Sequence, residues 1–91
     1  MTPKLAAYFG LTLSEEAEKL ISSLDYKALF SLLYDVVFCA FNEDVDRFYW
    51  QGAHLTRWFD DEINDLSEAD KINLIRYLGA CLQIKLMEAA T

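Results

Sequence analysis

Turn-forming residues are scarce in this sequence of 91 residues. Proline occurs once, at Pro3, and glycine three times, at Gly10, Gly52 and Gly79. Strand-rich folds need repeated glycine, proline, asparagine and aspartate turn signals, so their scarcity favours helices. A chain of this length has room for one hydrophobic core. We therefore predict a single all-α domain over residues 1–91, a bundle of four to five helices with short connections.

Histidine and cysteine, which often act in catalysis or metal binding, are also few. The chain has one histidine, His54, and two cysteines, Cys39 and Cys81, which lie in apolar helical patterns without CxxC spacing. No glycine-rich phosphate loop, HExxH motif or GxSxG motif is present, and nothing marks an activated nucleophile. We predict that the protein is not an enzyme and needs no cofactor. The cysteines are expected to be buried free thiols in a reducing compartment.

Features that direct a protein to a membrane or out of the cell are missing as well. No basic stretch followed by an apolar stretch and a small-residue cleavage site opens the chain. The longest apolar run, residues 24–41, approaches the length of a membrane span but carries Asp25, Lys27 and Asp35. We therefore expect a cytoplasmic protein with no membrane partner.

One acidic stretch has the opening spacing of a calcium-binding loop, with oxygen ligands at Asn42, Asp44 and Asp46. The sixth position, where such a loop requires glycine, is Arg47, and the twelfth, where it requires glutamate, is Ala53. These two departures exclude an EF-hand. No metal site is predicted elsewhere in the chain.

Apolar residues recur at helical spacing along most of the chain. The predicted helices cover residues 3–9, 13–23, 26–41, 53–66 and 67–87, with a turn or short helix over residues 47–51. Several of their ends carry recognisable signals: Gly10 after the first helix, a capping box of Thr12 with Glu15, Asp25 as a cap, and Ser67 with Asp70.

The helix over residues 26–41 is the most apolar. Apolar residues fill the i, i+3, i+4, i+7 template from Tyr26 to Phe41, and only Lys27, Ser31 and Asp35 make a thin polar stripe. A helix that is apolar nearly all round is expected to be enclosed by its neighbours. Asp35 then lies either on a narrow solvated side or against a base from another helix.

Charge is distributed unevenly. Residues 42–70 contain nine acids and two bases, a difference of −7 that equals the net charge of the whole chain. Such a concentration can attract a basic protein, and it argues against direct contact with nucleic acid, whose phosphates need a basic surface. The simpler interpretation is a solvated helix face that keeps the protein soluble.

Large aromatic residues stand among these acids. Phe48, Tyr49 and Trp50 precede a glycine in a weakly patterned segment, where three such side chains cannot all face one core. They either cover the protein's own core or anchor a partner, since aromatic residues are the usual hot spots of interfaces. The candidate partner-binding residues are Tyr49, Trp50, Asp60, Asp61 and Asp65.

The composition favours an interaction role. More than half of the residues are hydrophobic, and a domain this small leaves part of its apolar surface exposed. We predict a non-enzymatic protein–protein interaction module, a homodimer through the apolar faces of residues 26–41 and 72–86. The alternative is a monomeric inhibitor or adaptor that imitates nucleic-acid charge and captures a basic protein through residues 42–70. A small enzyme or ligand carrier with a pocket between helices is a third hypothesis.

Overall fold

The computed structural model describes residues 5–41 and 57–90, and every regular element within these ranges is a helix. The elements are α1 (Leu5–Tyr8), α2 (Glu15–Ser23), α3 (Tyr26–Phe41), α4 (Arg57–Asn64) and α5 (Glu68–Ala90). The prediction of an all-α bundle is therefore confirmed. The bounds of α3 are those predicted from its pattern.

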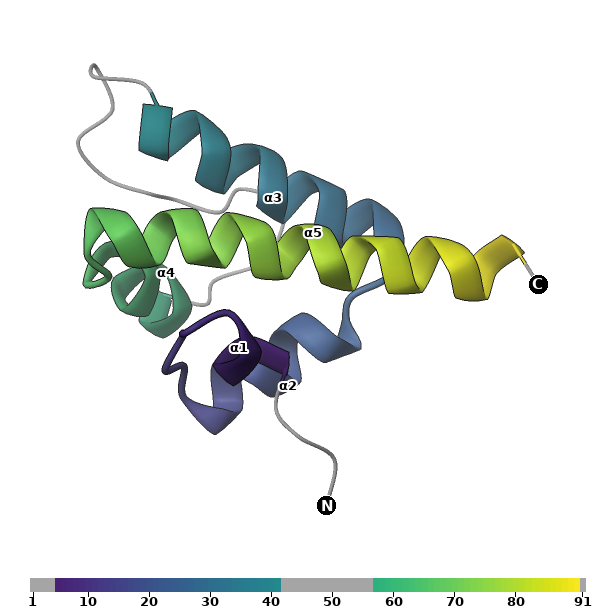
Figure 1. Cartoon of the computed structure of the whole chain (residues 1–91), viewed down its shortest axis with the longest axis horizontal. Coiled ribbons are helices and arrows are strands. Elements are labelled where there is room, and N and C mark those ends of the chain that lie inside the picture. The colour runs from purple at the N-terminus through teal and green to yellow at the C-terminus, as the bar shows by residue number, and fades with distance from the viewer. Residues whose placement is uncertain (1–4, 42–56, 91) are drawn as a thin grey trace.

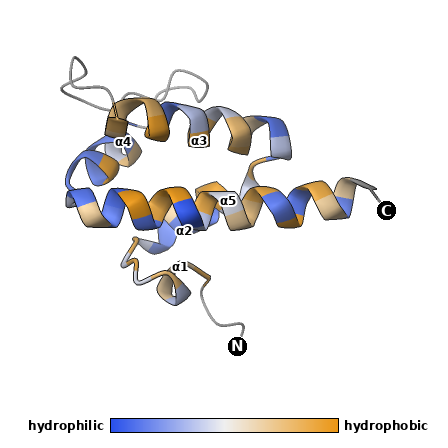
Figure 2. Cartoon of the chain, turned by 45° about the horizontal axis from the view of Figure 1, so that its top comes forward, coloured by the Kyte–Doolittle hydropathy of each residue, from blue (hydrophilic) through white to orange (hydrophobic). Residues whose placement is uncertain are grey.

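The long helix α5 is the axis around which the other helices are arranged (Figure 1). α3 lies along one side of α5 and runs in the opposite direction, α1 and α2 lie on the other side, and α4 lies near the start of α5 (Figure 1). Figure 2 shows a mainly hydrophobic α3 and a mainly hydrophilic α4. No helix in residues 5–41 and 57–90 is long and apolar enough to span a membrane.

Side chains from all five helices form one core on the two sides of α5. Leu74, Tyr77 and Leu78 are the buried residues of α5. Burying a large aliphatic or aromatic side chain contributes about 1.5–3 kcal/mol, so these contacts hold the short helices in place. The other buried residues are Ala6, Leu11, Leu13, Ala17, Ile21, Leu29, Leu32, Val36, Phe59 and Ile63.

Within residues 5–41 and 57–90, Gly10 in the turn after α1 is the glycine whose backbone conformation the fold requires. Gly10 has a φ of 77°, in the left-handed region that favours glycine. Its N–H donates to the carbonyl of Ala7 at 3.0 Å, and the N–H of Leu11 donates to the carbonyl of Ala6 at 3.0 Å. This pair of bonds is a Schellman motif, and it confirms the predicted end of the first helix at Gly10.

The predicted capping box of Thr12 and Glu15 is wrong. The N-cap of α2 is Ser14, whose hydroxyl accepts a hydrogen bond from the N–H of Ala17 at 3.1 Å. The segment before α2 keeps Thr12 from acting as the N-cap, because the side chains of Leu11 and Leu13 are both buried and leave Thr12 exposed between them. The helix therefore begins at Glu15 rather than at residue 13.

The other two predicted caps are confirmed. Asp25 accepts from the N–H of Ala28 through Oδ1 at 2.8 Å, and the hydroxyl of Ser67 accepts from the N–H of Asp70 at 3.1 Å. Elsewhere the helix ends differ by a few residues. α4 ends at Asn64, two residues before the predicted end, and α5 continues to Ala90. The predicted helical residues 3–4 and 53–56 lie outside the described ranges.

Candidate functional site

α3 buries one side against the core and exposes the other. Its buried residues are Leu29, Leu32 and Val36, and α5 is the helix that α3 contacts most. Five aromatic residues at helical spacing occupy the opposite side, and we call them the aromatic face. They are Tyr26, Phe30, Tyr34, Phe38 and Phe41, with exposed fractions of 38%, 60%, 61%, 49% and 69%. The prediction that neighbours enclose this helix is therefore wrong for the aromatic face.

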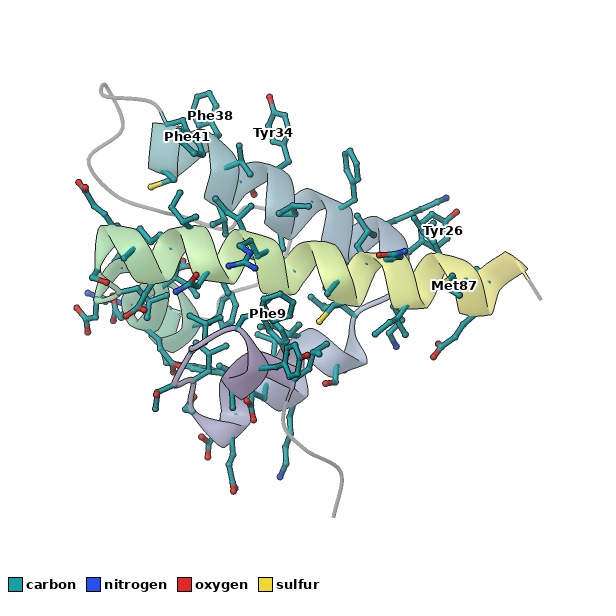
Figure 3. All side chains as sticks on the ribbon, viewed as in Figure 1. Phe9, Tyr26, Tyr34, Phe38, Phe41 and Met87 are labelled. Carbon is teal, nitrogen blue, oxygen red and sulfur yellow. The ribbon has the colours of Figure 1, made fainter. Side chains whose placement is uncertain are left out.

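Two neighbouring rings of the aromatic face stack on each other. Tyr34 and Phe38 are one helical turn apart, and their rings stack with centroids 6.4 Å apart and an interplanar angle of 13°. Figure 3 shows Tyr34, Phe38 and Phe41 pointing away from α5. Rigid rings held on a packed helix lose little conformational entropy when a partner covers them, which suits them to binding.

The acidic residues of α4 do not form one open surface. Asp60 and Asp61 are half-buried, and Asp65 is exposed just beyond the end of α4. Three of the predicted contact residues are thus close in the sequence but differ in their accessibility. The other two, Tyr49 and Trp50, lie outside the described residues, so the aromatic part of that prediction stays a prediction.

One acid of α4 has a structural role that its sequence position does not reveal. The carboxylate of Glu62 accepts two hydrogen bonds from Ser14, one from the backbone N–H at 2.9 Å and one from the hydroxyl at 2.6 Å. Because Ser14 is the N-cap of α2, this carboxylate also adds negative charge at the positive end of that helix. We call this arrangement the Ser14–Glu62 clamp.

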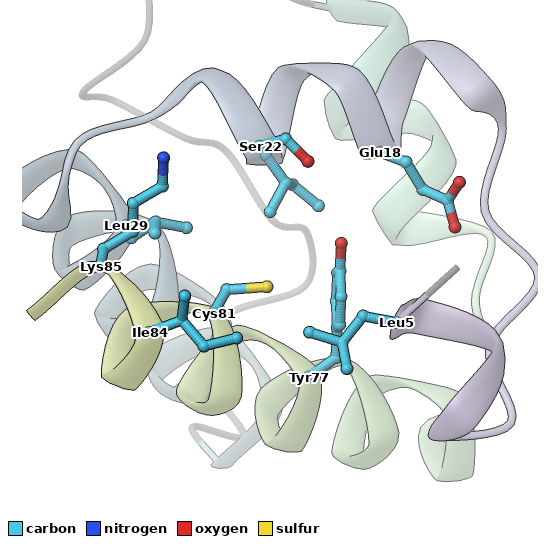
Figure 4. A pocket seen from close by; sticks show the side chains of 9 residues that line it. Leu5, Glu18, Ser22, Leu29, Tyr77, Cys81, Ile84 and Lys85 are labelled. Carbon is cyan, nitrogen blue, oxygen red and sulfur yellow. The ribbon is translucent and has the colours of Figure 1, made fainter. Parts of the chain in front are cut away.

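A cavity of about 400 Å³ opens between α2 and α5 (Figure 4). The side chains of Tyr77 and Cys81, one helical turn apart on α5, interact with each other in the wall of this cavity. Burial raises the pKa of Tyr77 far above its ordinary value. Burial also raises the pKa of Cys81, and the neighbouring Tyr77 and Lys85 side chains lower it by a smaller amount. The lining residues are Leu5, Glu18, Ile21, Ser22, Leu29, Tyr77, Cys81, Ile84 and Lys85.

The sequence pattern did not identify Tyr77, Lys85 or Glu18 as members of a common site. Tyr77 and Lys85 are eight residues apart on α5, which puts them on neighbouring parts of one helix face. That spacing is visible in the sequence. The approach of α2, which supplies Glu18 and closes the cavity, is not.

Of the remaining candidates for chemistry, only the two cysteines lie within the described ranges. His54 and the calcium-like stretch 42–53 lie outside the described residues. Cys39 and Cys81 are free thiols, as predicted, but both are half-buried rather than fully buried. Within the described ranges, no three histidine, cysteine, aspartate or glutamate residues are grouped so that they could hold a metal ion.

Comparison of the chain with protein-family models, curated proteins and solved structures finds no match. The fold and the surface define the protein as an all-α bundle with an exposed aromatic helix face.

Proposed function

We propose that the protein is a non-enzymatic protein–protein interaction module that self-associates through the aromatic face of α3. The observation that supports this proposal is the exposure of five aromatic side chains on one side of a single helix. Aromatic residues are enriched at interfaces, where they supply most of the binding energy. An apolar patch of this kind would otherwise be an aggregation risk in a protein that works alone.

The area of the aromatic face fits a small dimer. An aromatic side chain has about 150–250 Å² to bury, so the exposed fractions of these five correspond to roughly 500 Å² on each copy. Two copies would bury roughly 1,000 Å², which is at the lower limit for a specific interface. We therefore expect reversible association with a Kd in the micromolar range, about 10 µM.

The sequence of α3 favours an antiparallel arrangement of the two helices. Lys27 and Phe41 are each seven residues from Tyr34, so a two-fold axis at Tyr34 places Lys27 of one copy against Phe41 of the other. An ammonium over an aromatic ring contributes about 0.5–2 kcal/mol. A parallel pair would instead bring the two Lys27 side chains together. An intermolecular nuclear Overhauser effect between Lys27 and Phe41 in a mixed-label sample would establish the pairing; its absence from an otherwise assigned interface would refute it.

The alternative proposal is that residues 42–70 capture a basic protein. Glu62 is less available for such a contact because it is bonded to Ser14, and Asp60 and Asp61 are only half-exposed. The two proposals differ in their salt dependence. Contacts between charges on a protein surface weaken as salt shortens the Debye length, whereas apolar contacts do not.

The test is the molar mass in solution, measured by sedimentation equilibrium over a range of concentrations at about 50 mM and about 500 mM salt. We expect a monomer–dimer equilibrium that changes little with salt. Tyr34→Lys should make the protein monomeric, because it places a charge at the centre of the aromatic face. Tyr8→Lys is the matched control, since Tyr8 is 85% exposed on α1, away from that face.

Both variants should retain the helical circular dichroism of the wild type, because Tyr34 and Tyr8 are exposed. A wild-type protein that is monomeric at every concentration would overturn self-association. A dimer that persists in Tyr34→Lys but not in Tyr8→Lys would place the interface elsewhere. A complex with a basic protein that dissociates at the higher salt would support the alternative.

A further inference from the structure

The cavity between α2 and α5 has the construction of a small-molecule site. Side chains from four helices line it: Leu5 from α1, Ile21 from α2, Leu29 from α3 and Ile84 from α5 give it aliphatic walls. Its volume of about 400 Å³ lies at the lower end of the range for small-ligand pockets. Mostly apolar walls with a few converging polar groups are the usual composition of such sites.

The charges of the cavity are separated. Figure 4 shows Lys85 of α5 near one end and Glu18 of α2 near the other, with Tyr77 on the side of Glu18. The ammonium of Lys85 is close enough to the thiol of Cys81 to lower its pKa, against the larger effect of burial. A ligand in the cavity therefore meets positive charge at one end only.

We propose that this cavity binds a medium-chain fatty acid, with its carboxylate at Lys85 and its alkyl chain between Ile21, Leu29 and Ile84. The charge of Lys85 selects an anionic head group. The aliphatic side chains select a flexible alkyl tail, since Tyr77 is the one aromatic residue among those that line the cavity. The volume fits a chain of about eight to ten carbons.

Glu18 adds a second element of specificity. Its carboxylate lies near the end of the cavity that the tail of the ligand would reach. A second carboxylate on the ligand would meet like charge there, as well as losing the apolar contacts of a terminal methyl group. The site should therefore prefer a monocarboxylate to a dicarboxylate of the same length.

Isothermal titration calorimetry of the whole chain with decanoate tests the proposal. We expect a Kd of about 100 µM, which corresponds to a modest binding energy per ligand atom. Methyl decanoate and decanedioate should each bind at least about ten times more weakly, because the ester offers no charge to Lys85 and Glu18 repels the second carboxylate. Equal binding of methyl decanoate would overturn the assignment of an anionic head group.

A matched pair of variants separates the charge of Lys85 from a general effect on the fold. Lys85→Met keeps most of the apolar stem and removes the ammonium, so decanoate should bind about ten times more weakly. Lys71→Met is the control, because Lys71 is also a half-buried lysine of α5 but does not line the cavity. Equal affinities of the two variants for decanoate would refute the role of Lys85.

The thiol of Cys81 gives a second, independent measurement. In a Cys39→Ser background, decanoate should slow the alkylation of Cys81 by iodoacetamide several-fold, because the ligand would cover the sulfur. An unchanged rate at saturating decanoate would show that the ligand binds elsewhere. Tyr34→Lys should bind decanoate like the wild type, because Tyr34 points away from α5 (Figure 3) and does not line the cavity.

Discussion

Replacing Glu62 by glutamine tests the Ser14–Glu62 clamp with the smallest change of shape. The wild-type carboxylate accepts hydrogen bonds at 2.9 and 2.6 Å from the N–H and hydroxyl of Ser14. A glutamine side chain has one acceptor oxygen, so its NH₂ group faces one of the two donors. A hydrogen bond to a charged group contributes about 1.5–3 kcal/mol, and the lost charge at the start of α2 about 0.3–1 kcal/mol.

Because Ser14 and Glu62 are half-buried, solvent reduces these contributions, and we expect Glu62→Gln to destabilise the protein by about 2 kcal/mol. For a domain of this size, such a loss lowers Tm by roughly 10 °C. Urea unfolding followed by far-ultraviolet circular dichroism measures the change. Asp65→Asn is the control, since Asp65 is an exposed acid of the same region and should change stability by less than about 0.5 kcal/mol.

A double-mutant cycle with Ser14→Ala isolates the interaction itself. Ser14→Ala also removes the cap of α2, which costs about 1 kcal/mol alone, so the two single changes should not add. We expect a coupling energy of about 1–2 kcal/mol between Ser14 and Glu62. A coupling near zero, or a Glu62→Gln variant as stable as Asp65→Asn, would refute the argument that the clamp stabilises α2.

Two further predictions concern the backbone and the pH dependence of stability. Gly10→Ala should lower stability by about 1–2 kcal/mol in thermal unfolding, because Gly10 has a φ of 77°; a neutral effect would contradict a left-handed turn after α1. The pKa values of Cys81 and Tyr77 are raised in the folded protein, so the stability from their neutral forms is complete below about pH 8.5 and is lost as the pH rises. Tyr77→Phe should make the fall above about pH 10 shallower in urea titrations, and an unchanged slope would exclude Tyr77 as a cause.

The sequence predicted the existence of α3 but not which side of it is buried. Its pattern contains apolar residues all round, and both the Leu29–Leu32–Val36 side and the aromatic face satisfy a helical template. Hydrophobicity alone does not separate a leucine that packs in the core from a phenylalanine that stays exposed on the surface. The choice depends on where α5 lies, which is a tertiary property.

The error at the start of α2 has a similar cause. Thr12 with Glu15 and Ser14 with its following residues both satisfy the local rules for a helix start. Two interactions outside the helix decide between them, namely the burial of Leu11 and Leu13 and the bonds from Ser14 to Glu62. Asp25 and Ser67 were predicted correctly because their caps involve only neighbouring residues.

The cavity was beyond prediction for the same physical reason. Its residues come from four helices, and no local pattern states which faces of α2 and α5 will approach each other. The sequence did indicate surplus apolar surface, and the aromatic face accounts for part of it. It also suggested an acidic surface, but it could not show that Glu62 is used within the protein itself.

The Ser14–Glu62 clamp also has a consequence for the order of events during synthesis. The two residues are 48 positions apart, so at about 5–20 residues per second Glu62 is made several seconds after Ser14. α2 has nine residues, too few for a stable isolated helix. The N-terminal part of the nascent chain should therefore stay incompletely folded until α4 has emerged. Folding should then be a late and cooperative event that joins α2 to α4.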